Sequence, residues 1–116
     1  MVTFTLTHPA GHKIAPPFFG LVDSGADGTI FPMAVMADLG ISQADCDELD
    51  QMGAGGASKF YCWKTGSLAA DFFGRPVNLK VQFSLTPFIL LGREDFFSAF
   101  RVTFDQRSLR FTVESY

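Results

Sequence analysis

The sequence predicts an all-β fold with one or two short helices, and two patterns carry this prediction. Apolar and polar residues alternate strictly over residues 2–7 and again over residues 77–83, which is the period of a half-buried strand. Short apolar runs at residues 18–22 and 88–91 are typical of strands covered on both faces. Turn-forming residues, such as the Gly-Arg-Pro of residues 74–76, separate these segments. We therefore expect short strands joined by turns.

The first half of the chain adds one short strand and one short helix. Two consecutive prolines exclude a helix from residues 14–22, because proline lacks the amide donor that a helix interior needs. Residues 29–31 are predicted as a strand, and residues 32–39 as a helix that begins with proline and stops at a glycine. Residues 42–49 are acidic and are expected to form one further turn.

The second half of the chain is expected to contain strands, one helix and a hairpin. The glycine-rich residues 52–57 are expected to be the most flexible stretch. Residues 59–63 and 67–73 have the composition of strands, and residues 93–100 that of a short helix. Residues 102–113 are predicted to close the fold as a hairpin around a polar turn.

Composition and charge restrict the classes of function. A chain of 116 residues is expected to form a single domain, residues 1–116. The net charge of −3, without a basic cluster, argues against nucleic acid or an anionic membrane as partner. No apolar run approaches the ~18 residues of a membrane helix, and no signal peptide is apparent. Cys46 and Cys62 are too few for a disulfide scaffold, so we expect a cytoplasmic protein, or a domain released from a larger precursor.

The stretch LVDSGADGTIFP, residues 21–32, places a carboxylate at the end of an apolar strand. Gly25 and Ala26 have almost no side chain, so a second backbone can approach the loop closely. A lone Asp23 at this place is either a cap or an active group. Two such carboxylates about 3 Å apart would share one proton, because both charges cannot be kept. Such a pair can activate a water molecule and protonate a carbonyl oxygen.

Two motifs together resemble a known family. Asp-Ser-Gly-Ala-Asp after an apolar strand precedes a glycine-rich segment and then Ile-Leu-Leu-Gly-Arg at residues 89–93. This order resembles the retropepsin-like, single-domain aspartic proteases, over a span from about Phe4 to Val113. The longer, more helix-like residues 31–51 are nearer to cellular and bacterial members than to viral ones. The resemblance implies a closed-barrel-like acid protease fold with a flap hairpin, an aspartic endopeptidase activity, and no metal or cofactor.

The resemblance also implies a role for each residue of the two motifs. Asp23 would be the catalytic aspartate, and Ser24 would form a hydroxyl network beneath a pair of aspartates. Gly25 would contact the substrate backbone through its carbonyl oxygen. Asp27 would hold the substrate main chain and pair with Arg93.

The remaining expected site residues lie in the loop, the flap and the late motif. Ala26 is expected among the substrate-binding residues, and Gly92 would pack beneath the catalytic loop with residues 89–91. The flap tip would supply the other substrate contacts: Gly53, Ala54, Gly55 and Gly56. The small Ala54 stands where viral enzymes place a larger apolar residue.

One aspartate cannot form a pair, and the chain contains no second Asp-(Thr/Ser)-Gly. The expected site therefore requires a homodimer in which each copy gives one Asp23 across a twofold axis. Residues 2–7 and 109–113 are expected to be interface strands, because pairing would cover their edges. The expected partner is a polypeptide substrate, and activity is expected to peak at acid to mildly acid pH.

Plainer interpretations stay open beside these. Asp23 can be the cap of a turn, the Asp27–Arg93 pair an ordinary surface ion pair, and residues 53–56 a mobile loop. The rival function is a catalytically weak or inactive domain of the same fold that dimerises or binds peptide. A third possibility is an inactive fragment that works only inside a larger protein. A metal site at His8 and His12 is disfavoured, because the proline and glycine beside them oppose a helix.

Overall fold

The computed structural model describes residues 1–8, 10–23, 25–53, 56–108 and 110–116. The first strands are β1 (Val2–Thr7), β2 (Lys13–Val22), β3 (Ile30–Pro32) and β4 (Cys46–Gly53). The later strands are β5 (Gly56–Phe72), β6 (Arg75–Ser84), β7 (Ile89–Leu91), β8 (Phe100–Asp105) and β9 (Arg110–Ser115). Short helical segments are η1 (Met33–Val35), α1 (Met36–Leu39), η2 (Gln43–Asp45) and α2 (Phe96–Ala99).

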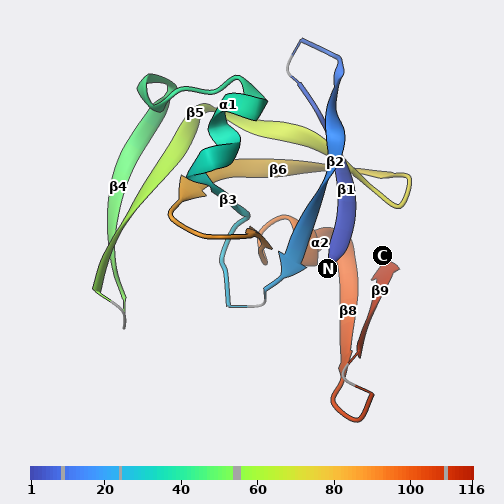
Figure 1. The fold of residues 1–116 in the computed structure, drawn as a ribbon. Coiled ribbons are helices and arrows are strands. Elements are labelled where there is room, and N and C mark those ends of the chain that lie inside the picture. Colours follow the sequence, from blue (N-terminus) through green and yellow to red (C-terminus); the bar gives the residue numbers. More distant parts are fainter. Residues whose placement is uncertain (9, 24, 54–55, 109) are drawn as a thin grey trace.

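Strands β1 to β7 form one sheet that closes on itself (Figure 1). The hydrogen-bonded order is β1-β2-β7-β3-β6-β5-β4, and β1 also pairs with β5, so six strands form a closed barrel. Strand β4 continues the sheet beyond β5, outside the ring. The prediction of a mostly β, closed-barrel-like fold is confirmed. The described residues contain four short helical segments, where one or two short helices are predicted.

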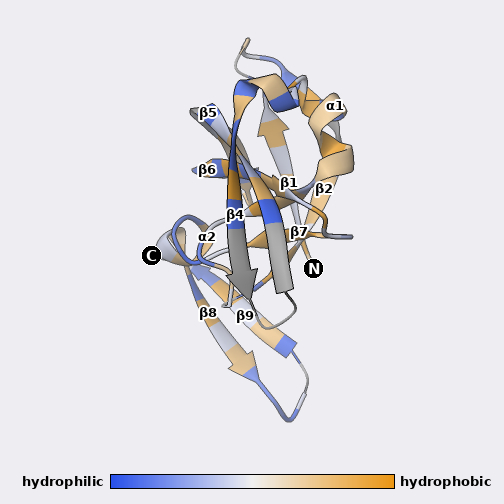
Figure 2. Ribbon diagram, turned by 90° about the vertical axis from the view of Figure 1, so that its left-hand side faces the viewer, coloured by the Kyte–Doolittle hydropathy of each residue, from blue (hydrophilic) through white to orange (hydrophobic). Residues whose placement is uncertain are grey.

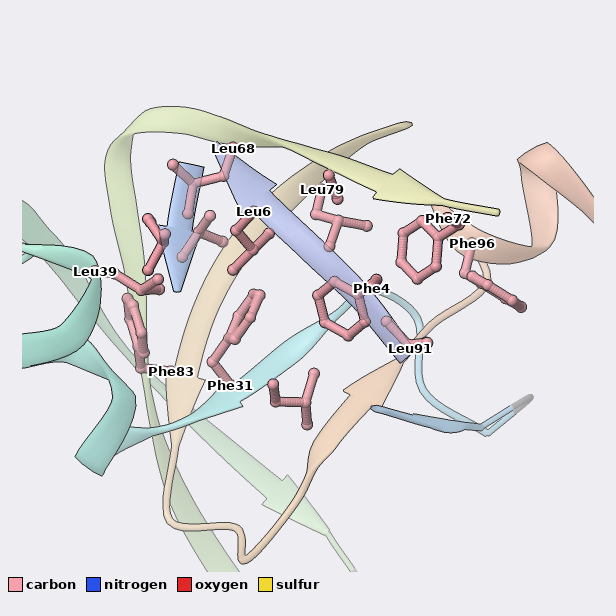
Figure 3. Close-up of a cluster of buried hydrophobic side chains, with 14 of the residues drawn as sticks. Phe4, Leu6, Phe31, Leu39, Leu68, Phe72, Leu79, Phe83, Leu91 and Phe96 are labelled. Atoms are coloured by element: carbon pink, nitrogen blue, oxygen red, sulfur yellow. The ribbon is translucent and has the colours of Figure 1, made fainter. Parts of the chain in front are cut away.

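The core is a cluster of phenylalanine and leucine side chains inside the barrel (Figure 3). The alternation of residues 2–7 buries Val2, Phe4 and Leu6 in β1, as the sequence predicts. The ring centroid of Phe72 lies 4.7 Å from that of Phe4 and 5.2 Å from that of Phe96. Such aromatic pairs add to the stabilisation that comes from burying their surface.

The predicted helices are shorter in the structure. The helix of residues 32–39 is divided into η1 and α1, and Gly40 ends it in the left-handed conformation with φ 69°. The helix of residues 93–100 is reduced to α2, because Phe100 is buried and already begins β8.

The acidic segment 42–49 is largely a strand rather than a turn. Only η2 forms the turn, and the segment from Cys46 onward pairs with β5 along the whole of β4. Residues 47–50 lack the alternation of apolar and polar residues that predicts a half-buried strand. All four residues are exposed, as expected for a strand outside the closed barrel. Strand β5 is also continuous where two strands are predicted, with a register shift between Cys62 and Ser67.

Two hairpins extend from the barrel in the direction of the loop that follows β2 (Figure 1). One consists of β4 and β5, whose ladder reaches the Gly53–Gly56 pair, and the other is the separate two-stranded sheet of β8 and β9. The closing hairpin that the sequence predicts is therefore confirmed. The expectation that residues 2–7 present a free edge is wrong for Thr5–Thr7, because these residues pair with β5.

Candidate active site

The topology brings the two sequence motifs together. Strand β7 lies between β2 and β3, parallel to β2 and antiparallel to β3. The described residues between β2 and β3, 23 and 25–29, lie at the end of β7, where Gly92 follows. The amide of Asp23 donates to the carbonyl of Leu91 at 3.0 Å, and the amide of Arg93 donates to the carbonyl of Ala26 at 3.0 Å. Backbone hydrogen bonds thus hold the loop against the late motif.

Gly92 lies directly against the backbone of Gly28. A Cβ atom built on Gly92 would lie 2.4 Å from the carbonyl oxygen of Gly28 and 2.5 Å from its carbonyl carbon. No side chain fits at this distance from rigid backbone atoms. The requirement for glycine is therefore one of space, and it fixes how closely the loop approaches the barrel.

A buried hydrogen bond between Thr29 and Asp95 holds the same loop against the barrel. The hydroxyl of Thr29 is fully buried and donates to Oδ1 of Asp95 at 2.7 Å. Asp95 also accepts from the amide of Phe96 at 2.9 Å and from that of Lys80, on β6, at 3.3 Å. Because a buried carboxylate needs such partners, the contacts tie the loop, the start of α2 and β6 into one unit.

Asp23 lines a pocket of about 280 Å³. The side chain is half-buried, and its Oδ1 accepts from the amide of Gly25 at 2.9 Å. The pocket is lined by the loop and by side chains of β3, β5, β6 and β7: Asp23, Gly25, Ala26, Asp27, Gly28, Ile30, Phe60, Gln82 and Leu90. The pocket therefore combines the Asp23 carboxylate, the backbone of the loop and the apolar side chains of Ile30, Phe60 and Leu90.

Asp27 and Arg93 form an ion pair between the carboxylate Oδ1 and a guanidinium nitrogen. Their side chains are 77% and 58% exposed. At this exposure the pair contributes less than about 1 kcal/mol to stability. Its geometric effect is to hold the Asp27 carboxylate toward Arg93, the last residue of the late motif, beside the pocket that Asp27 lines.

The other predicted site residues are distributed as follows. Ala26 is buried and lines the pocket, while its carbonyl oxygen is engaged by the amide of Arg93. Gly53 and Gly56 face each other at the end of the β4–β5 ladder. Three predicted residues lie outside the described residues: Ser24, Ala54 and Gly55.

Sequence reasoning missed the support and the walls of the pocket. Thr29 and Asp95 belong to no recognisable sequence motif. They meet because β7 is inserted in the sheet between β2 and β3. The position of Gln82 could be found, because the alternation of residues 77–83 points it away from the core.

The two cysteines have environments of low reactivity. Burial is the main cause that raises the pKa of the Cys46 thiol and that of the Cys62 thiol. Both cysteines are free, and the raised pKa keeps each thiol protonated near neutral pH. In the described part of the chain no three His, Cys, Asp or Glu side chains gather as a metal site requires.

Comparisons with known proteins give no family for this chain: no family model matches it, and no curated protein matches it. Within the described residues, no helix has the length and apolar character needed to cross a bilayer.

We predict that Gly92→Ala destabilises the protein by about 1–3 kcal/mol, the usual cost of overpacking. The new methyl group would collide with the Gly28 backbone, which cannot move without displacing the loop. Gly28→Ala is the matched control, because its methyl group would meet only the ends of the Gln82 and Glu94 side chains, at 3.3 and 3.7 Å. Denaturant unfolding measures both. An equal loss in the free energy of unfolding in the two variants would contradict the packing argument.

We predict that Thr29→Val lowers the free energy of unfolding by about 1–3 kcal/mol, because Asp95 loses a buried hydrogen-bond partner. Thr29→Ser keeps the hydroxyl and should retain most of this stability. Thermal unfolding of the two variants beside the parent measures the difference. A valine variant as stable as the serine variant would show that the hydroxyl does not support the loop.

Proposed function

We propose that this chain is an aspartic endopeptidase of the retropepsin-like type. The observation that carries the proposal is that Asp23 lines a pocket and belongs to a loop held by the Gly92 segment. The order of the two sequence motifs supports the same proposal. The β4–β5 hairpin supports it too, because Phe60 of β5 lines the pocket, as expected of a flap that covers substrate.

The proposed mechanism needs two Asp23 carboxylates. Water held between them attacks a peptide carbonyl, one carboxylate accepts the proton of the water, and the other carboxyl protonates the carbonyl oxygen to give a tetrahedral diol. The C–N bond then breaks as the first carboxyl protonates the departing amine nitrogen, and a diol hydroxyl returns a proton to the second carboxylate as the product acid forms. The substrate lies extended and forms β-type hydrogen bonds with exposed backbone of the loop and flap. Closure of the hairpin over the substrate excludes bulk water.

The second carboxylate comes from a second copy of the chain. The hairpin of β8 and β9 supports this part of the proposal, because its apolar side chains stand opposite each other: Val102 with Val113 and Phe104 with Phe111. Phe104 is 56% exposed although it is a large apolar residue. Figure 2 shows these hydrophobic segments on a hairpin that projects from the barrel. Val102, Phe111 and Val113 are half-buried against the core, so Phe104 is the apolar residue of this hairpin that a second copy would cover.

The rival function is a non-catalytic domain that dimerises or binds peptide. The hydrogen bond from the Gly25 amide to Asp23 favours it, because this is also the contact of a plain turn-capping aspartate. A transition-state inhibitor of aspartic proteases separates the two functions. Binding of the inhibitor with uptake of a proton would support the enzyme, and dimers without inhibitor binding or cleavage would support the module.

We predict that Asp23→Asn abolishes peptide cleavage and leaves the fold intact. Asparagine keeps the oxygen that accepts from the Gly25 amide, but it cannot serve as a general base. Cleavage of a mixed peptide library between about pH 3 and pH 8 measures activity, and circular dichroism measures the fold. Undiminished cleavage by the asparagine variant would exclude the mechanism.

We predict that the chain sediments as a dimer and that Phe104→Glu shifts it to monomer, because a charge would be buried in the apolar contact. Thr103→Glu is the matched control, since Thr103 is exposed on the opposite face of the same strand. Analytical ultracentrifugation over a range of concentrations measures the shift. Dissociation by the control variant alone would place the contact on the other face of the hairpin.

A further inference from the structure

The wall of the pocket contains a row of side chains that crosses three strands. Leu90 of β7 is paired with Ile30 of β3, and Ile30 is paired with Gln82 of β6. All three line the pocket beside Asp23. Their chain neighbours Leu91, Phe31 and Phe83 are fully buried in the core, so the row stands on the outer face of the barrel.

Gln82 is the polar member of this row. Its side chain is half-buried, and a Cβ atom built on Gly28 would lie 3.3 Å from its Nε2. The amide group therefore reaches the backbone of the loop that carries Asp23. Ile30, Leu90 and Phe60 form the apolar part of the wall around it.

A side chain that fills this pocket would take the Gln82 amide out of water. The amide has two donors and an acceptor, and leaving them unpaired costs free energy. An apolar side chain cannot pair with them, whereas an amide or hydroxyl group can. A site that contains such a group discriminates more strongly than a purely apolar pocket does.

The negative charges around the pocket further restrict which substrate side chain can bind there. Asp23 and Asp27 line the same pocket, so an acidic side chain would be repelled. We propose that Gln82 selects a hydrogen-bonding side chain that is not acidic, such as Asn, Gln, Ser or Thr, at one position of the bound peptide. This inference rests on the proposed function only in taking a peptide as the ligand.

The test compares the parent chain with Gln82→Leu. Gln43→Leu is the matched control, because Gln43 is exposed on η2 and does not line the pocket. A peptide library carries either Asn or Leu at each position in turn. Binding is measured with each chain in the Asp23→Asn background, where no peptide is consumed, and kcat/KM is measured with Asp23 present.

We expect the parent and the Gln43→Leu chain to prefer Asn over Leu at one position by about tenfold, the worth of one neutral hydrogen bond. Gln82→Leu should lose or reverse that preference. Unchanged preference in Gln82→Leu would overturn the inference, and cleavage by the parent in the same experiment would leave the proposed function standing. Preference in binding without cleavage by the parent would support the inference and count against the protease. A parent that neither binds nor cleaves any peptide would overturn both.

Discussion

The contact between Gly92 and Gly28 is the constraint on which the candidate site depends. The two backbones approach so closely that a Cβ atom on Gly92 would lie 2.4 Å from the Gly28 carbonyl oxygen. Hydrogen bonds from the Asp23, Arg93 and Glu94 amides lie on both sides of this contact. Because β7 stands between the strands on either side of the loop, the strand order brings Gly92 and the loop together. The position of the Asp23 carboxylate follows from that packing.

The polar contacts connect this constraint to the pocket wall. Thr29 and Asp95 hold the loop, and Asp95 also receives the amide of Lys80, two residues before Gln82 on β6. The loop and the β6 wall are therefore parts of one hydrogen-bonded unit. Phe60 belongs to β5, which pairs with β6 and carries the β4 hairpin. One side of the pocket, formed by the loop and β6, is therefore held by buried hydrogen bonds. The other side is formed by Phe60 of the β4–β5 hairpin, which extends from the barrel.

Most strands could be predicted from the sequence, because a strand buried on one face alternates apolar and polar residues, as β1 and β6 do. It was insufficient for β4, since residues 47–50 are exposed and carry no such pattern. The loop residues of the site stood out through their motif. Thr29 and Asp95 did not, because their partnership spans 66 positions and arises only from the strand order. Local propensity contains no information about a pairing of that kind.

The separation of the two motifs along the chain has a consequence for folding. The ion pair of Asp27 and Arg93, like the bond of Thr29 and Asp95, closes a loop of 66 residues. Contacts so distant in sequence form slowly, because the entropy of a large loop is lost before they stabilise anything. During synthesis, the segment around Asp23 leaves the ribosome long before Gly92. We therefore expect a nascent chain to carry the carboxylate without an organised pocket until nearly all of the barrel has emerged.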